Sequence, residues 1–204
     1  MTTFRVTLLM GLLALLQACV GIPTSKPIDN AALQAMHQRH LQNLSTITAF
    51  TLQGRIGVQT EGKGFSGSLT WQHNISSDDI ALYSPLGGQV ASIKKTADNV
   101  TLEDAKGNSI SAADVETLTQ NALGWKLPLT GLADWSLGRP ATGEIQASTL
   151  DKQGHLNTLK QEGWDIEYQN YTEQNGHFLP KKIILRNDKA HLKLLVENWR
   201  IVGN

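Results

Sequence analysis

Apolar and polar residues alternate along most of the chain after residue 49, which is typical of strands that bury one face. In residues 50–59 the apolar side of this alternation consists of Phe50, Leu52, Ile56 and Val58. Comparable stretches follow at 65–72, 79–84, 89–95, 98–103, 108–111, 143–149, 155–162, 164–171, 181–187 and 190–199. Most of the turns between them are short, so consecutive strands are expected to pair antiparallel. The pattern predicts about eleven strands.

Residues 29–45 have helical spacing instead. Their apolar positions are Leu33, Met36, His40 or Leu41, and Leu44. His37 and His40 lie three residues apart on this helix, a spacing that can share a metal ion. With no third ligand nearby in the sequence, we interpret them as surface histidines and predict no metal site.

A second helical region interrupts the strands at residues 111–140. It starts with Ser111 and Asp114 at the spacing of a capping box. Leu129, Leu132 and Trp135 then follow three residues apart, which predicts a short helix closed by Gly138. This insert is unusually apolar for a connection between strands.

Two features of the strands bear on the shape of the sheet. In the last strand Leu192, Leu194 and Val196 keep period two but Trp199 is out of phase, so we expect a β-bulge near Glu197–Asn198. The apolar face is also bulky, with Phe65, Leu69, Trp71, Trp164, Ile166 and Tyr168. These side chains could fill a closed core, or line a half-barrel whose helices form a lid over an apolar cavity. The pattern alone leaves both possibilities open.

The N-terminus has the features of an export signal. Arg5 precedes a short apolar run, which predicts a signal peptide at residues 1–18. Cys19 is the only cysteine, so an intermolecular disulfide, a free thiol or a lipid attachment site are its possible roles. Residues 16–19 (LQAC) resemble the bacterial lipobox, which implies acylation of Cys19. Val20, in place of Asp, implies the outer membrane. Residues 19–29 are expected to be a flexible tether and residues 30–204 a single domain.

Charge and motifs exclude several function classes. The 18 basic and 18 acidic residues balance, with no basic stripe that would indicate nucleic-acid binding. Residues 62–67 (GKGFSG) match a dinucleotide fingerprint in spelling, but they lie in a predicted hairpin and lead into no helix. No nucleophile–base pattern is evident. We therefore expect no enzymatic activity and no cofactor.

Residues 84–88 (SPLGG) form a predicted turn between two strands. Ser84, Pro85, Gly87 and Gly88 are ordinary turn residues, but Leu86 is not. Its side chain could fold back onto the sheet or remain exposed at the tip of the turn. Leu86 is therefore a candidate functional residue.

Several motifs together resemble the LolB family of outer-membrane lipoprotein receptors. They are the lipobox, the segments beginning at Phe50 and Gly67, SPLGG, GWKLPLTGLADWSLGRP, QEGWDIEY, LPKKIIL and LKLLVENW. Apart from the lipobox, the resemblance covers residues 45–200. The resemblance implies a mainly β fold with an α lid, an unclosed antiparallel β-barrel covering an apolar cavity, as in LolA and LolB. It implies a protein anchored in the outer membrane and facing the periplasm. The receptor takes lipoproteins from the periplasmic carrier LolA by their acyl chains and releases them into the inner leaflet.

The resemblance also suggests which residues carry this function. We expect the cavity and lid to be lined by Phe65, Leu69, Trp71, Trp125, Leu129, Leu132, Trp135, Trp164 and Ile166. Leu86, with Pro85 and Gly87, is the expected membrane-insertion loop. The expected partners are LolA, cargo acyl chains and the bilayer, and the protein is expected to be a monomer. The alternatives are a structural outer-membrane lipoprotein with a filled core and a lipid-anchored hydrolase.

Overall fold

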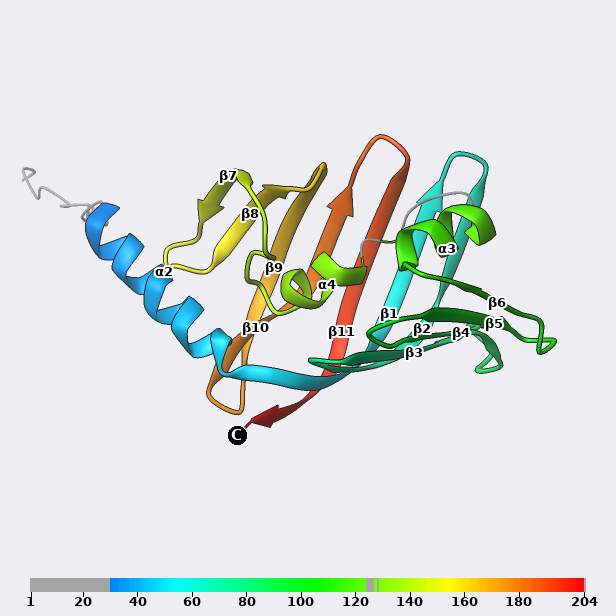
Figure 1. Cartoon of the computed structure of the whole chain (residues 1–204). Coiled ribbons are helices and arrows are strands. Elements are labelled where there is room, and N and C mark those ends of the chain that lie inside the picture. Colours follow the sequence, from blue (N-terminus) through cyan, green and yellow to red (C-terminus); the bar gives the residue numbers. More distant parts are fainter. Residues whose placement is uncertain (1–29, 124–126, 128, 204) are drawn as a thin grey trace, which may run out of the picture.

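One antiparallel sheet of eleven strands dominates the computed structural model, which describes residues 30–123, 127 and 129–203 (Figure 1). The strands are β1 (Ile47–Thr60), β2 (Lys63–Asn74), β3 (Ser77–Tyr83), β4 (Gln89–Lys95), β5 (Val100–Asp104), β6 (Ser109–Ala112), β7 (Ile145–Leu150), β8 (Leu156–Gln161), β9 (Trp164–Gln174), β10 (His177–Arg186) and β11 (Ala190–Gly203). The helices are α2 (Asn30–Ser45), α3 (Val115–Leu123) and α4 (Leu129–Ser136). The eleven predicted strands and the three helical segments are therefore confirmed.

The sheet is open. Its strand order is β6-β5-β4-β3-β2-β1-β11-β10-β9-β8-β7, so β6 and β7 are its two edges. Pairing of the first strand with the last joins the two halves of the chain. The segment with α3 and α4 connects one edge to the other over the concave side of the curved sheet (Figure 1). The predicted unclosed barrel is confirmed.

Irregularities in the pairing of β1 with β11 let the sheet coil. Gln53 pairs with Asn198 and Gly54 pairs with Val196, which leaves Glu197 as the extra residue of a bulge. This confirms the bulge predicted from the phase of Trp199. A Cβ atom on Gly54 would lie 2.3 Å from the carbonyl oxygen of Leu195, so only glycine permits this close approach.

The start of α3 differs from the start that the sequence pattern predicts. Ser111 lies in β6, and α3 begins only at Val115. Asp114 is the cap, because its Oδ1 accepts a 2.7 Å hydrogen bond from the backbone N–H of Thr117. The expected end of α4 is confirmed: Gly138 has a φ of 79° and its N–H bonds to the carbonyl of Trp135.

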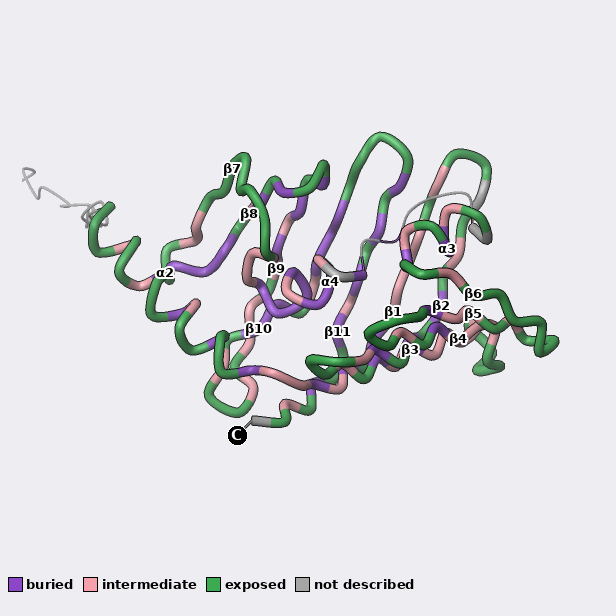
Figure 2. Tube along the Cα trace, in the orientation of Figure 1, coloured by how far each residue is buried: buried purple, intermediate pink, exposed green. Residues whose placement is uncertain are grey.

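The half of the sheet formed by β8, β9 and β10 is filled. Figure 2 shows buried residues on these strands, on the C-terminal half of α2 and on α4. Large buried side chains there include Leu44, Trp135, Leu156, Leu159, Trp164, Ile166, Tyr168 and Leu179. This half is a packed core rather than a cavity.

The expectation that His37 and His40 lie on the surface is wrong. They are only 9% and 8% exposed. His37 Nδ1 lies 2.8 Å from the carbonyl oxygen of Gly154, and the ring of His40 packs edge-on against that of His155 at 4.6 Å. The turn before β8, distant in sequence, covers this face of α2. The part of the chain that the structure describes holds no group of three or more potential metal ligands.

Candidate functional site

A cavity of about 300 Å³ lies on the concave face over the other half of the sheet. Residues from β1 to β4, β10 and β11 form its wall, and Leu132 of α4 and Leu127 also line it. Among the residues that the structure describes, Thr60 is the polar member of a wall that is otherwise aliphatic, aromatic or glycine. Such a surface binds apolar groups by removing them from water.

The strand register explains why this wall is apolar. Alternate residues of β1, β2 and β3 face the concave side, and cross-strand pairing aligns them in rows. One row contains Trp71, Ile80 and Ile93, which pair in succession across β2, β3 and β4. All three line the cavity.

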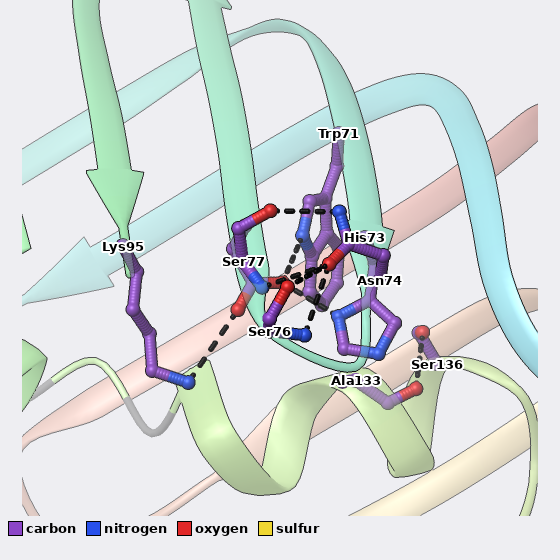
Figure 3. A network of polar contacts seen from close by, with 9 residues as sticks. Trp71, His73, Asn74, Ser76, Ser77, Lys95, Ala133 and Ser136 are labelled. Carbon is purple, nitrogen blue, oxygen red and sulfur yellow. Dashed lines mark hydrogen bonds and ion pairs between the residues drawn. The ribbon is translucent and has the colours of Figure 1, made fainter. Parts of the chain in front are cut away.

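The next row along the same strands is polar. His73 pairs with Asp78, and Asp78 pairs with Lys95. Asp78 is 4% exposed, and its Oδ1 lies 2.7 Å from His73 Nδ1 and accepts a 2.8 Å hydrogen bond from Trp71 Nε1. Lys95 Nζ lies 3.5 Å from Asp78 Oδ2. Figure 3 shows Trp71, His73 and Lys95 converging beside α4.

This environment keeps Asp78 ionised. Burial alone would raise the pKa of the carboxyl, but hydrogen bonds from His73 and Trp71 and the charge of Lys95 outweigh that effect. The pKa of Asp78 is therefore lowered from its usual value. The cavity is thus bounded on one side by a buried carboxylate, which also fixes the orientation of the Trp71 indole.

The cover of the cavity is attached firmly at α4. Trp135 Nε1 donates a 2.9 Å hydrogen bond to Gln161 Oε1 of β8, and both residues are fully buried. Arg139, just after α4, donates through Nη1 to the carbonyl of Leu44 at the end of α2. Leu132 therefore projects toward the cavity from a helix held at both the sheet and α2.

The turn between β3 and β4 lies next to this cavity. Leu82 and Val90, on either side of the turn, both line the cavity wall. The N–H of Gly87 bonds to the carbonyl of Ser84 at 2.9 Å, and Gly87 has a φ of 88°, a region that favours glycine. This rigid turn leaves Leu86 99% exposed, so the side chain does not fold back onto the sheet.

A family model described as "Outer membrane lipoprotein LolB" matches residues 48–199. The chain belongs to the LolB family. It is 33% identical over 196 residues to the outer-membrane lipoprotein LolB of Pseudomonas savastanoi pv. phaseolicola, an alignment that covers 96% of each chain. The LolB of Pseudomonas aeruginosa strain PAO1 matches with the same identity and coverage. The family prediction is confirmed.

A solved structure supports the fold of this LolB-family chain. A LolA superfamily protein from Nitrosomonas europaea superposes with a TM-score of 0.51 at 9% sequence identity, covering 82% of this chain and 94% of that one. Identity at this level supports the architecture alone. That architecture is the mainly β, unclosed antiparallel sheet described above.

The expected cavity residues of this LolB-family chain divide into two groups. Phe65, Leu69, Trp71 and Leu132 line the cavity. Leu129 and Trp135 belong to α4, the cover, but they are buried in the packed core with Trp164 and Ile166, and none of these four lines the cavity wall. Trp125 and Cys19 lie outside the described residues.

Sequence reasoning missed most of the remaining wall. The additional lining side chains include Ile56, Val58, Ile80, Leu82, Ile93 and Leu194. The period-two alternation of these residues identifies them as inward-facing. Which of the rows they form lie under the lid depends on the cross-strand register. Asp78 was also missed, although a carboxylate at an inward position two residues before Ile80 breaks the apolar alternation.

Within the described part of the chain, no helix has the length and apolarity needed to cross a membrane.

Proposed function

We propose that this LolB-family protein is a receptor anchored in the outer membrane that accepts lipoproteins from the periplasmic carrier LolA. It holds the acyl chains of the cargo in the apolar cavity and inserts the cargo into the inner leaflet of the outer membrane. The observation that carries this proposal is the apolar cavity on the concave face. The names of the relatives, outer-membrane lipoproteins, support the location.

The proposed transfer involves no covalent step and runs downhill in affinity. Each tenfold preference for the receiver corresponds to about 1.4 kcal/mol. At about 25 cal/mol per Å², roughly 60 Å² of additional buried apolar area supplies that preference. A wall with side chains such as Phe65, Leu69 and Trp71 provides such area without fixing the register of a flexible chain.

Cys19 is the proposed lipid attachment site. Two or three acyl chains on this residue hold the protein on a membrane, because each buried methylene contributes about 0.8 kcal/mol. Residues 19–29 then form the tether to α2. The protein acts as a monomer in this proposal, with Leu86 contacting the bilayer at the release step.

A transfer assay with purified components tests the function. LolA loaded with a lipoprotein is mixed with the protein, and the amount of cargo that changes partner is measured before and after liposomes are added. Val58→Glu places a charge in the cavity wall, whereas Gln59→Glu places the same charge at the next, exposed position of β1.

The two variants have different expected outcomes. Val58→Glu should not take cargo from the carrier, and Gln59→Glu should take it as the unmodified protein does. If the unmodified protein takes no cargo, or if its melting is insensitive to lipids and detergents, the structural-lipoprotein alternative is favoured instead.

A further inference from the structure

The polar row of His73, Asp78 and Lys95 lies directly beyond the apolar row of Trp71, Ile80 and Ile93. Because both rows belong to β2, β3 and β4 and are two residues apart, their side chains face the same concave side. The apolar row lines the cavity and the polar row does not. The cavity therefore ends where the side chains change from apolar to charged.

This polar row is held in place. Asp78 has two hydrogen-bonding neighbours on β2 and a cation on β4, and its side chain is 3% exposed. An acyl chain that displaced Asp78 would leave a buried carboxylate without partners. The free-energy cost of that is far larger than the cost of leaving the apolar chain end in the cavity. The polar row is therefore a fixed polar boundary next to the apolar cavity.

We propose that the row of His73, Asp78 and Lys95 is a depth stop that sets how much of an acyl chain the cavity accepts. This inference rests on the proposed lipoprotein-receptor function and adds a basis for selecting chain length. Asp78 is the central residue, because it contacts both other members and also orients Trp71 in the cavity wall.

The volume is consistent with such a limit. A methylene takes up about the same space as a water molecule in the liquid, roughly 30 Å³, so 300 Å³ holds about ten methylenes. One row of the sheet is about 7 Å along a strand, which is the length of roughly five methylenes in an extended chain. Replacing the polar row by small apolar side chains would therefore extend the site by up to about that number.

Saturated fatty acids of increasing length are the appropriate probes. Their affinity is measured by displacement of a fluorescent apolar dye from the unlipidated protein, Cys19→Ala. While each added methylene enters the cavity, binding should tighten roughly fourfold. In the unmodified cavity this gain should stop at a defined carbon number, where the chain end meets Asp78.

The variant Asp78→Ala/Lys95→Ala replaces the two charged side chains of the row by small apolar ones and opens the space that they fill. It should move the point at which the gain stops to longer chains by several carbons. Asp79→Ala/Lys94→Ala is the matched control, since Asp79 and Lys94 form the neighbouring cross-strand pair and both are exposed. The control should leave the stopping point unchanged.

A second measurement needs no substitution in the row. A fatty acid with a ¹³C-labelled terminal methyl group should give NMR contacts to Ile80 or Ile93, and none to Val100, which pairs with Lys95 beyond the apolar row.

The outcomes separate this inference from the proposed function. If the protein binds no fatty acid of any length, the receptor function itself fails. If it binds them but the stopping point is the same with and without the polar row, or the chain end contacts Val100, the depth stop is refuted and the receptor function stands.

Discussion

Replacing Leu86 by glutamate should separate cargo acceptance from cargo delivery. Leu86 is 99% exposed, so almost its entire side chain is available for burial in a bilayer. Full burial of a leucine is favourable by about 1.5–3 kcal/mol, or roughly 10- to 150-fold in a membrane-contact equilibrium. A glutamate loses that contribution. The folded protein should be unaffected, because a substitution at an exposed position changes stability by about 0.5 kcal/mol or less.

The assay follows one lipoprotein through two steps. Leu86→Glu should remove cargo from LolA normally and then transfer it to liposomes at least tenfold more slowly. Ile75→Glu is the matched control, because Ile75 is also an exposed aliphatic residue at a hairpin tip, 85% exposed, but at the other end of β3. It should deliver cargo at the normal rate. Normal delivery by Leu86→Glu, or equal defects in both variants, would refute a role of this leucine in release.

Three further substitutions or conditions test the fold. Gln161→Leu leaves the buried indole N–H of Trp135 without its acceptor, so urea denaturation should show a loss of about 1–3 kcal/mol in the free energy of unfolding. Burial lowers the pKa of His40 from 6.5 to about 4. Between these pH values the unfolded chain therefore binds a proton at His40 that the folded protein does not. The free energy of unfolding should fall as pH drops from 6.5 toward 4, by up to about 1.4 kcal/mol per pH unit. His40→Leu should flatten this part of a urea-unfolding pH profile. Gly54→Ala should lower the melting temperature by several degrees, since its Cβ would lie 2.3 Å from the carbonyl oxygen of Leu195; an unchanged melting temperature would contradict the close approach at the bulge.

Local features were predictable from the sequence. Period-two alternation located the eleven strands, since each strand buries one face regardless of its distant partners. The phase change at Trp199 located the bulge at Glu197. Turn chemistry correctly identified residues 84–88 as a turn, and the structure showed that Leu86 is exposed there.

Long-range features were not predictable in the same way. Trp71 and Trp164 both lie on inward faces, but whether each lines a cavity or a packed core depends on where α2 and α4 cover the sheet. His40 is buried by the turn before β8, which is over a hundred residues away in sequence. The role of Asp78 can be recognised only once the strand register places it between His73 and Lys95.

The two edge strands, β6 and β7, form no ladder with each other in the described part of the chain. In a closed barrel, the number and stagger of strands fix the diameter. Here the enclosed space depends on how tightly the sheet coils. Small changes in twist between neighbouring strands can widen the cavity while every backbone ladder remains intact. Accommodating a second acyl chain beside the first is therefore a matter of elastic bending and lid contacts, with no hydrogen bond of the sheet broken.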